Sequence, residues 1–250
     1  MQKSVPRLVA HRGYAARYPE NTLLAIQSAV EAGAHYVEFD VQLTADGVPV
    51  LFHDRDCQRM CGQPGPIHDY NLQQAKTFSV SEFSRFGYRY VGNPITTLQE
   101  IVNYLATVPY VRAFIELKRL SLQHFSIDSV LDRVLPEIAP LGDQAVVISY
   151  SLEALVAVRE RSSVTVGAVF DRWRERKQRL IRQLQPEYLF TDIHELPRFG
   201  KLKCSGCELA VYECVDPEQA IKVHQRGVDL VETFEIAEML QALRLHAGGR

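Results

Sequence analysis

Two strand-like runs of the sequence carry carboxylates among apolar residues. In Tyr36–Val41 the acids Glu38 and Asp40 are two positions apart, so a β-strand would point both to one side, about 7 Å apart. A second run ends in Glu116 and Lys118, which share a face in the same way. Buried carboxylates that face one interior repel unless a cation lies between them, and Mg²⁺ and Ca²⁺ prefer oxygen ligands. An exposed strand edge with a solvated ion pair would suit the same residues, so the runs alone leave a metal site open.

Two histidines stand at the ends of short apolar runs. His11 follows Leu8-Val9-Ala10, and His53 follows Leu51-Phe52. Because imidazole titrates near neutrality, two such side chains on either side of a reacting group can act as general base and general acid. A single histidine at a strand end is also a common structural residue, so a catalytic role for either depends on the two lying together.

Arg12 lies between His11 and Gly13, which places a guanidinium beside backbone that can approach a ligand closely. Metal-binding acids, paired imidazoles, this arginine and Lys118 together suit phosphoryl chemistry better than carbonyl chemistry. The sequence contains no nucleophile elbow, no phosphate-cradling P-loop and no dinucleotide-binding glycine fingerprint. These absences argue against serine hydrolases, P-loop enzymes and dinucleotide-dependent enzymes.

These residues need elements that bring them to one place, and the pattern of the chain predicts a parallel sheet. Short β-branched runs alternate with stretches of 3.6-residue periodicity, as in βα units. We expect a TIM-type (β/α)8 barrel, in which the carboxyl ends of the strands meet at one mouth. The predicted strands, one more than such a barrel holds, are Leu8–His11, Tyr36–Val41, Val48–His53, Ala113–Leu117, Ala145–Ser149, Thr165–Phe170, Glu187–Phe190, Leu209–Glu213 and Asp229–Val231. The predicted helices include Thr22–Ala32, Thr97–Ala106, Ile127–Ile138, Leu152–Arg161, Arg174–Leu184, Pro217–Gln225 and Ala237–Leu245.

Local signals refine this outline at three places. Asn21 is expected to cap the first helix, and Gly33 occupies the position of a C′ glycine. Asp46-Gly47 is typical of a hairpin turn, and a hairpin is expected to carry His53 away from the mouth, whereas a parallel or detached segment would keep it there. Residues 55–94, rich in Gly, Pro and aromatic residues, predict a loop-rich subdomain inserted into a single domain over residues 1–250.

Composition limits the partners and the compartment. The 250 residues include 28 Lys and Arg against 30 Asp and Glu, a net charge of −2, so no basic field is present to hold nucleic acid or an anionic membrane. No apolar run approaches the roughly 20 residues of a membrane-spanning helix, and no secretory h-region follows Met1, so we expect a cytoplasmic protein without a stable membrane anchor. The five cysteines are expected to be reduced thiols; a zinc site from Cys57, Cys61, Cys204 and Cys207 is a weaker alternative.

Taken together, the chemistry-bearing motifs resemble those of the glycerophosphodiester phosphodiesterase family. Several ordered motifs fall within the first half of the chain, whereas the second half shares mainly the βα pattern. The motifs are His11-Arg12-Gly13, Pro19-Glu20-Asn21-Thr22, Ala32-Gly33, Glu38-Phe39-Asp40-Val41, Thr44-x-Asp46-Gly47, His53-Asp54 and Glu116-Leu117-Lys118.

This resemblance implies a TIM-type barrel with a small subdomain inserted after the third strand. It implies a metal, Mg²⁺ or Ca²⁺, on Glu38, Asp40 and Glu116, and an acid–base pair of His11 and His53. It places Arg12 and Lys118 at the phosphate, and we add Glu20 as a supporting residue behind them. The implied reaction is hydrolysis of a small glycerophosphodiester to glycerol 3-phosphate and an alcohol, as part of lipid and glycerol metabolism.

The sequence also departs from the family, which keeps other functions open. Tyr212 stands where the family often has tryptophan, and Val231-Glu232-Thr233-Phe234 replaces the usual Thr-Asp ending of the last strand. A lysophospholipase D-like or other phospholipid phosphodiesterase is one alternative, and a non-catalytic phosphate-ester binding module is another. An apolar rim would favour the first, and its only candidates are aromatic residues that we expect to form the core of the insertion: Phe78, Phe83, Phe86, Tyr88 and Tyr90.

Overall fold

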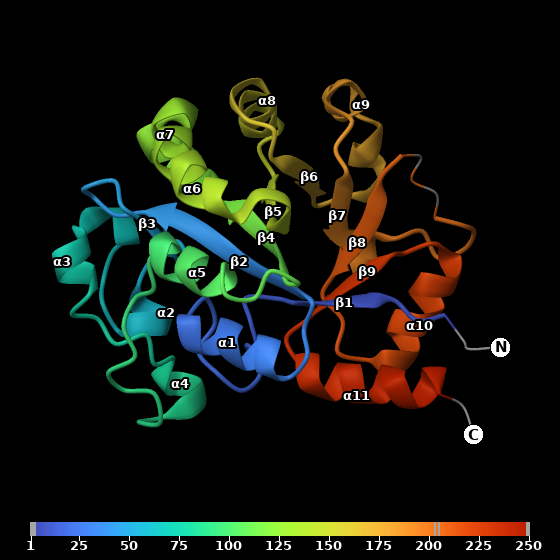
Figure 1. Ribbon diagram of the computed structural model, residues 1–250, viewed down its shortest axis with the longest axis horizontal. Helices are drawn as coiled ribbons and strands as arrows, with labels where there is room; N and C mark the ends of the chain where they lie inside the picture. Colours follow the sequence, from blue (N-terminus) through green and yellow to red (C-terminus); the bar gives the residue numbers. More distant parts are fainter. Residues whose placement is uncertain (1–3, 203, 205, 249–250) are drawn as a thin grey trace.

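Parallel strands form a closed barrel that helices surround (Figure 1). The computed structural model describes residues 4–202, 204 and 206–248. Within this part of the chain one sheet has the strand order β1-β9-β8-β7-β6-β5-β4-β2-β3 and closes because β1 also pairs with β2. All these pairings are parallel except that of β2 with β3, so the expected eight-stranded (β/α)8 barrel is confirmed.

The bounds of the elements match the predicted alternation closely. The strands are β1 (Arg7–Ala10), β2 (Tyr36–Leu43), β3 (Pro49–Leu51), β4 (Arg112–Leu117), β5 (Ala145–Ser149), β6 (Thr165–Phe170), β7 (Tyr188–Asp192), β8 (Glu208–Tyr212) and β9 (Leu230–Thr233). The α-helices are α1 (Leu23–Glu31), α2 (Gln58–Cys61), α3 (Leu72–Ala75), α4 (Phe83–Phe86), α5 (Leu98–Leu105), α6 (Arg119–Phe125), α7 (Ile127–Ile138), α8 (Leu152–Arg161), α9 (Arg179–Leu184), α10 (Pro217–Arg226) and α11 (Ile236–Ala247). Short 3₁₀ helices are η1 (Ile67–Asp69), η2 (Ala139–Gln144), η3 (Trp173–Lys177) and η4 (Ile193–Glu195).

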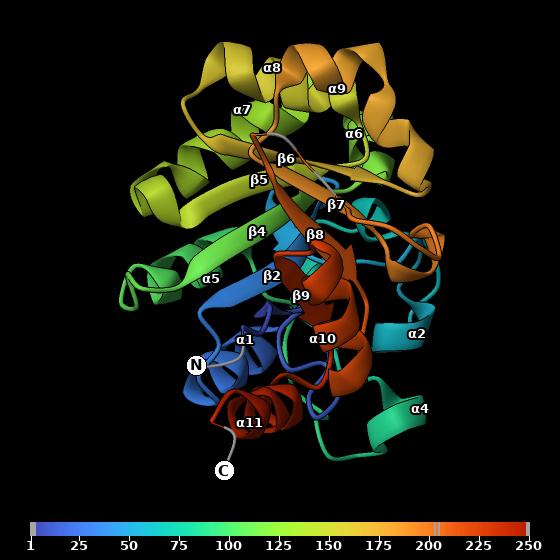
Figure 2. The ribbon, with the colours of Figure 1, turned by 90° about the vertical axis from the view of Figure 1, so that its right-hand side faces the viewer.

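Alternation along the strands sorts side chains between the barrel interior and the helix layer. Figure 2 views the barrel from the side of the molecule that carries both termini and shows helices around the strands. The interior is packed with apolar side chains such as Val9, Phe114 and Phe190. At the amino ends of the strands polar contacts close the interior, including Arg112 Nη1 to the Tyr188 hydroxyl at 2.7 Å. Polar interior positions at the opposite, carboxyl ends are therefore the ones that face the mouth.

The surplus strand β3 is the second arm of a hairpin, and this corrects one expectation. β3 runs antiparallel to the end of β2, with Val41 opposite Leu51 and Leu43 opposite Pro49. Because β2 continues beyond the barrel rim, the returning arm travels back toward the mouth, and the Phe52 N–H donates to the Asp40 carbonyl at 3.0 Å. The hairpin therefore returns His53 to the mouth; the prediction that a hairpin would remove it was wrong.

Residues 55–94 leave the βα alternation and form short helices beside β3. This segment carries α2, η1, α3 and α4 and lies at the opposite side of Figure 1 from the two termini. Its apolar cluster includes Met60, Ile67 and Val80. The two ends of the segment lie together, since the Leu51 N–H donates to the Thr96 carbonyl at 2.8 Å.

Only some of the five aromatic residues expected to form the core of the insertion pack into its apolar cluster. Phe78 contacts it, but Phe83 and Tyr88 are 54% and 82% exposed and lie edge to face with ring centroids 5.0 Å apart. The expectation that these aromatics form the insertion's core was wrong for this pair, because α4 is too short and too peripheral to bury them.

The N-cap of the first helix lies one residue later in the sequence than expected. Thr22 is the N-cap, and its side chain accepts from the Ala25 N–H at 3.1 Å. Asn21 instead has a left-handed backbone and binds Asp40 through its side chain, so the prediction of an Asn21 cap was wrong. The prediction for Gly33 holds, because its φ of +100° follows the helix end directly.

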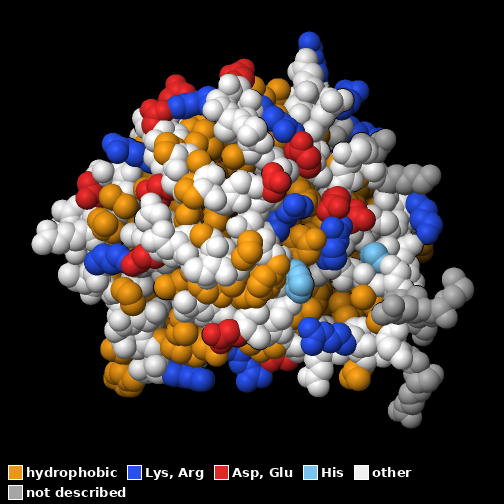
Figure 3. Space-filling view, viewed as in Figure 1, with side chains coloured by type: hydrophobic (Ala, Val, Ile, Leu, Met, Phe, Trp, Pro, Cys, Tyr) orange, Lys and Arg blue, Asp and Glu red, His pale blue; other side chains and the backbone are white. Residues whose placement is uncertain are grey.

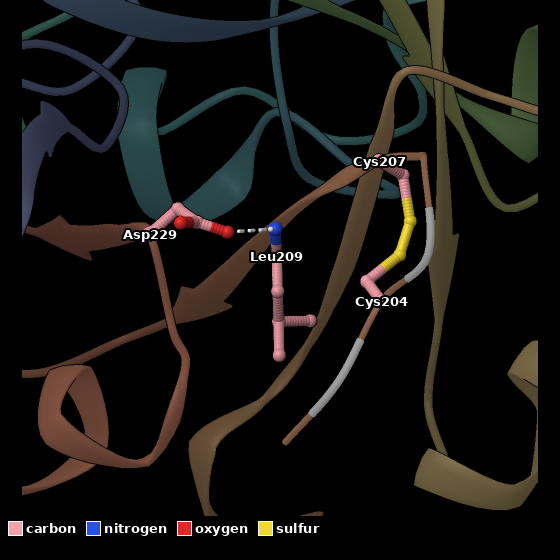
Figure 4. The surroundings of a disulfide bond; sticks show 4 residues. All are labelled: Cys204, Cys207, Leu209 and Asp229. Carbon is pink, nitrogen blue, oxygen red and sulfur yellow. Dashed lines mark hydrogen bonds between the residues drawn. A yellow bond between two sulfur atoms is a disulfide. The ribbon is translucent and has the colours of Figure 1, made fainter. Parts of the chain in front are cut away.

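The cysteines also differ from the sequence-based expectation. Cys204 and Cys207 form a disulfide beside β8, near the contact between the Asp229 carboxylate and the Leu209 N–H (Figure 4). Their separation of three positions brings the two Cα atoms to 5.6 Å, within the range of a disulfide. Cys57 and Cys61 are free, so these four cysteines do not form a shared zinc site.

The surface agrees with the charge balance of the sequence. On the face shown in Figure 3, acidic and basic side chains are interspersed, with no extended field of one sign. In the described part of the chain, no helix combines the length and the apolar character needed to cross a bilayer.

Candidate active site

A small cavity at the carboxyl ends of the barrel strands collects most of the residues predicted to do chemistry. Its volume is about 80 Å³. It is lined by His11, Arg12, Glu38, His53, Glu116, Lys118, Ile148, Tyr150, Val169, Phe190, Tyr212 and Glu232. The first six were predicted from sequence, and Asp40 lies directly behind them. A larger cavity, at the amino-terminal side of the barrel, contains none of these residues.

Three carboxylates meet beside this cavity. Glu38 and Asp40 lie on one face of β2, and Asp40 is the register partner of Glu116 on the neighbouring strand β4. One carboxylate oxygen from each of Glu38, Asp40 and Glu116 lies within 4.8 Å of the other two. The i, i+2 spacing and the parallel register together produce this cluster.

Burial and charge give the three acids different protonation behaviour. Burial raises the pKa of Glu38 well above its usual value, and the neighbouring acids Asp40, Glu232 and Glu116 raise it further. Burial likewise raises the pKa of Glu116. Burial opposes ionisation of Asp40 too, but the adjacent cations Lys118 and Arg12 hold its pKa below the usual range. Asp40 is therefore a carboxylate at neutral pH, whereas the two glutamates repel it and each other unless a proton or cation is present.

Two cations stand on opposite sides of Asp40. Lys118 Nζ lies 3.1 Å from Asp40 Oδ1 and 2.9 Å from Glu116 Oε1. Arg12 Nε lies 3.3 Å from Asp40 Oδ2, and its backbone N–H donates to Glu38 Oε2 at 2.9 Å. Although burial opposes charging of both side chains, these carboxylates raise the pKa of each, so both remain cationic.

The turn after β1 needs glycine to bring Arg12 into this position. Arg12 and Gly13 have φ values of +54° and +80°. A Cβ on Gly13 would lie 2.6 Å from the Ala25 carbonyl carbon, a distance that forces backbone to move. Gly13 therefore allows the turn to press against α1 while Arg12 reaches back to the acids.

His11 is buried against an aromatic ring at the cavity wall. It stacks on Phe234 with ring centroids 4.7 Å apart, and its Nε2 lies 3.8 Å from Glu38 Oε2. Its Nδ1 lies 3.5 Å from Glu213 Oε2. Burial lowers the pKa of His11 although Glu213 and Asp40 act to raise it, so its imidazole is neutral near pH 7.

His53 is held by its neighbour in sequence and by a buried amide. Nδ1 lies 2.9 Å from Asp54 Oδ1, which orients the ring and leaves Nε2 for another partner. The Gln42 side-chain amide donates to the carbonyls of Phe52, His53 and Asp54 at 3.0, 3.2 and 2.8 Å. The loop after β3 is thereby fixed to β2, which is why a residue outside the barrel strands reaches the cavity.

Glu20 and Asn21 support the site from the loop before α1. Glu20 Oε1 accepts from Arg12 Nη1 at 2.9 Å, so Glu20 lies behind Arg12 and does not line the cavity. The Asn21 amide donates to Asp40 Oδ2 at 2.8 Å and its carbonyl oxygen accepts from the Asp40 N–H at 2.9 Å. Asn21 therefore orients Asp40, a role missed because its position before a helix had predicted a cap.

Glu232 is a further acid of the cavity that the sequence did not assign. It is 3% exposed on β9, and its Oε1 has no hydrogen-bond partner among the described residues. Burial raises its pKa well above the usual value. Together with Glu38, which is buried, and Glu116, which is partly buried, it completes the three glutamates of the cavity. The sequence held a signal for this position: Leu230 and Glu232 lie on one strand face, and Leu230 is buried in the barrel interior, so Glu232 points to the same side.

The residues present fit a divalent cation. Three oxygen donors converge, and Glu38 Oε1 is buried without a hydrogen-bond partner in the described part of the chain. Burial first, and the neighbouring acids second, raise the pKa of Glu38 and Glu116, so neither carboxylate is stabilised as an anion without a cation beside it. This all-oxygen set suits Mg²⁺ or Ca²⁺ better than a soft metal.

Aromatic residues form the far wall of the cavity. The hydroxyls of Tyr150 and Tyr212 lie 2.8 Å apart, and Tyr212 also reaches the Phe170 carbonyl at 3.3 Å. The Arg119 guanidinium lies 4.7 Å from the Tyr150 ring centroid. Tyr212 thus lines the cavity, and its hydroxyl is held by the Tyr150 hydroxyl.

The sequence matches known proteins over most of its length. Residues 11–236 match the model of the glycerophosphoryl diester phosphodiesterase family. A glycerophosphodiester phosphodiesterase from Caldanaerobacter subterraneus is 26% identical over 243 residues, which cover 95% of this chain and 97% of the relative. An uncharacterized protein from Mycobacterium tuberculosis is 30% identical over 181 residues, and the match covers 70% of this chain but only 58% of that longer protein.

The fold also matches solved structures. A phosphodiesterase from Oleispira antarctica, solved in complex with the product sn-glycerol-3-phosphate, superposes with a TM-score of 0.82 over 96% of this chain and 97% of its own. Its sequence identity is 24%, so this likeness concerns the fold.

Proposed function

This chain belongs to the glycerophosphoryl diester phosphodiesterase family, and from that premise we propose that it hydrolyses glycerophosphodiesters to glycerol 3-phosphate and an alcohol. The observation that carries the proposal is the convergence of three carboxylates, two imidazoles, Arg12 and Lys118 on one cavity. The similarity to a glycerophosphodiester phosphodiesterase along nearly its whole length supports the substrate class.

The acids are proposed to hold a divalent cation. Glu38, Asp40 and Glu116 would bind Mg²⁺ or Ca²⁺, which when bound neutralises charge on a phosphate oxygen and orients phosphorus. Arg12 and Lys118 would stabilise the charge that develops on the other phosphate oxygens. Glu20 would hold Arg12 in place from behind.

The two histidines are proposed as the acid–base pair. His11, kept neutral by burial, would accept the proton of the attacking oxygen. Attack by water gives glycerol 3-phosphate directly, whereas attack by the neighbouring glycerol hydroxyl gives a cyclic phosphate that water then opens to glycerol 3-phosphate. His53, whose Nδ1 is bound by Asp54, would protonate the departing alcohol. Asp54 supports this role because a carboxylate beside Nδ1 fixes the orientation of the imidazole, so that Nε2 faces the cavity side.

The direct test is an incubation with glycerophosphocholine and glycerophosphoethanolamine, with and without EDTA, followed by detection of glycerol 3-phosphate. We expect product from at least one substrate, loss of product with EDTA and recovery with added Mg²⁺ or Ca²⁺. Absence of product under every metal condition would overturn the proposed function. Full activity in EDTA would overturn the metal assignment alone. Any turnover would exclude the non-catalytic binding module.

A lysophospholipase D-like activity is a second candidate because of one observation. The exposed Phe83 and Tyr88 form an apolar pair on the inserted segment, as a contact for an acyl chain would require. Lysophosphatidylcholine in the same assay tests it. Faster turnover of this substrate than of glycerophosphocholine, lost on Phe83→Ser, would favour the alternative.

Several wider features stay predictions alongside this function. They are residence in the cytoplasm, a place in lipid and glycerol metabolism, and the absence of nucleic-acid partners and of a stable membrane anchor. The division into a single domain over 1–250 with an inserted subdomain over 55–94 also stays a proposal, supported by the separate apolar cluster of that segment.

A further inference from the structure

Arg59 is the residue through which the inserted segment reaches the catalytic end of the barrel. It lies on α2, and its guanidinium contacts three carboxylates from separate parts of the chain. Arg59 Nε and Nη2 donate to the two oxygens of Asp54 at 2.6 and 2.8 Å. Nη2 and Nη1 donate to the two oxygens of Glu20 at 2.7 and 3.1 Å, and Nη1 also reaches Glu82 Oε1 at 3.1 Å.

Two of these carboxylates lead directly to residues of the proposed reaction. Asp54 Oδ1 also binds His53 Nδ1 at 2.9 Å. Glu20 Oε1 also accepts from Arg12 Nη1 at 2.9 Å. An unbroken row of alternating charges therefore runs from Arg12 through Glu20 and Arg59 to Asp54, which holds the His53 ring.

We propose that Arg59 is a positioning residue that fixes Arg12 and His53 relative to one another through Glu20 and Asp54. The inference rests on the proposed function. It makes the inserted segment a working part of the active site, because the guanidinium at the centre of the row belongs to that segment and not to the barrel.

The geometry explains why a guanidinium occupies this position. Its planar fork binds Asp54 with two nitrogens while the remaining donors bind Glu20, so both carboxylates are fixed in distance and in angle. A lysine ammonium is a single point charge and cannot form both paired contacts. The burial of Glu20, which is 4% exposed, adds to the effect, since a buried carboxylate without its partner would draw Arg12 toward itself.

A purely structural role is the competing explanation, and the chain offers a matched control. Arg85, on α4 of the same segment, shares the Glu82 carboxylate at 3.0 Å and donates to the Ala15 carbonyl at 2.7 Å. Its contacts among the described residues include neither Glu20 nor Asp54. Arg85→Gln therefore weakens the attachment of the inserted segment without interrupting the row of charges.

The experiment compares Arg59→Gln, Arg59→Lys and Arg85→Gln in the full chain. Steady-state kinetics with glycerophosphocholine give kcat and KM, and thermal melting reports stability. We expect Arg59→Gln to lower kcat by about 10²-fold, the cost of a misplacement of about 1 Å at a reacting group, with KM changed far less. Added guanidinium ion should restore part of the lost kcat. Arg59→Lys, which keeps the charge, should still lose about tenfold, whereas Arg85→Gln should retain kcat within about twofold.

Each other outcome contradicts the inference in a defined way. Normal kcat in Arg59→Gln, or in Arg59→Lys if the glutamine variant does not fold, would overturn it. An equal fall of kcat in Arg85→Gln would show that the segment acts only through its attachment. If the unaltered protein does not hydrolyse glycerophosphodiesters at all, the proposed function fails first, and that result is distinct from an active enzyme that is indifferent to Arg59.

Discussion

A divalent cation should stabilise this protein against thermal unfolding, because the acids of the carboxylate cluster repel one another without it. Glu38, Asp40 and Glu116 present oxygens within 4.8 Å of one another. Two unit charges 4.8 Å apart repel by about 3.5 kcal/mol at an effective dielectric constant of about 20, and the ion pairs of Lys118 partly offset this repulsion. Without a cation this repulsion destabilises the folded chain, whereas in the unfolded chain the three acids are apart.

Binding to the folded state alone gives the magnitude of the expected shift. A cation at about 100 times its Kd adds about 2.7 kcal/mol to the free energy of unfolding. For a chain of this length about 1 kcal/mol moves Tm by about 2–4 °C, so saturation should raise Tm by about 5–11 °C. The measurement is a melting curve in chelator, followed by titration with Mg²⁺ or Ca²⁺ at constant ionic strength.

Two variants test which acids are responsible. Glu116→Gln removes a member of the cluster and should abolish most of the shift. Glu232→Gln removes a carboxylate of the same cavity that lies outside the cluster and should leave the shift in place. No shift with either ion, or an equal loss in both variants, would refute the assignment of the cation to these three acids.

Further predictions concern catalysis, pH and backbone strain. His11→Ala and His53→Ala should each lower kcat by about 10²–10⁴-fold with Tm nearly unchanged, and robust activity in either variant would remove that residue from the reaction. In chelator, the midpoint of urea unfolding should rise as the pH falls from about 7.5 to about 5.5, because the raised pKa values of Glu38, Glu116 and Glu232 mean that the folded state binds protons more tightly than the unfolded state does. The lowered pKa values of His11 and His68 act in the opposite sense, but the three glutamates outnumber them, so a midpoint that falls over this range would contradict the burial of the acids. Gly13→Ala should destabilise the fold by about 2–5 kcal/mol, from positive φ and a Cβ 2.6 Å from the Ala25 carbonyl carbon, and a urea midpoint equal to that of the unaltered protein would contradict it.

The barrel could be predicted from sequence because its signals are local. Each predicted strand matches an observed one, since short apolar, β-branched runs are properties of single segments. The acids of Tyr36–Val41 could be placed on one face for the same reason. The predicted helix Arg174–Leu184 is instead η3 followed by α9, and α6 was not predicted, because helix ends depend on packing that no short segment specifies.

The hairpin shows what a local signal leaves out. Asp46-Gly47 predicted the turn correctly, but the destination of His53 depends on how far β2 continues beyond the barrel rim, which only the pairing with β4 determines. Asn21 and Arg59 were missed for a related reason. Their partners, Asp40 and Glu20, are distant in sequence, and no spacing rule connects them.

The two ends of the inserted segment lie together, and this allows the segment to vary between related enzymes. Val50 and Thr97 form a bridge where the chain leaves β3 and where it enters α5, so the excursion between them begins and finishes at one point of the sheet. Its length and sequence can change, or be exchanged for those of a relative, without shifting the register of any barrel strand. A transplanted segment would need to place an arginine at the position of Arg59, so that Arg12 and His53 stay fixed relative to one another.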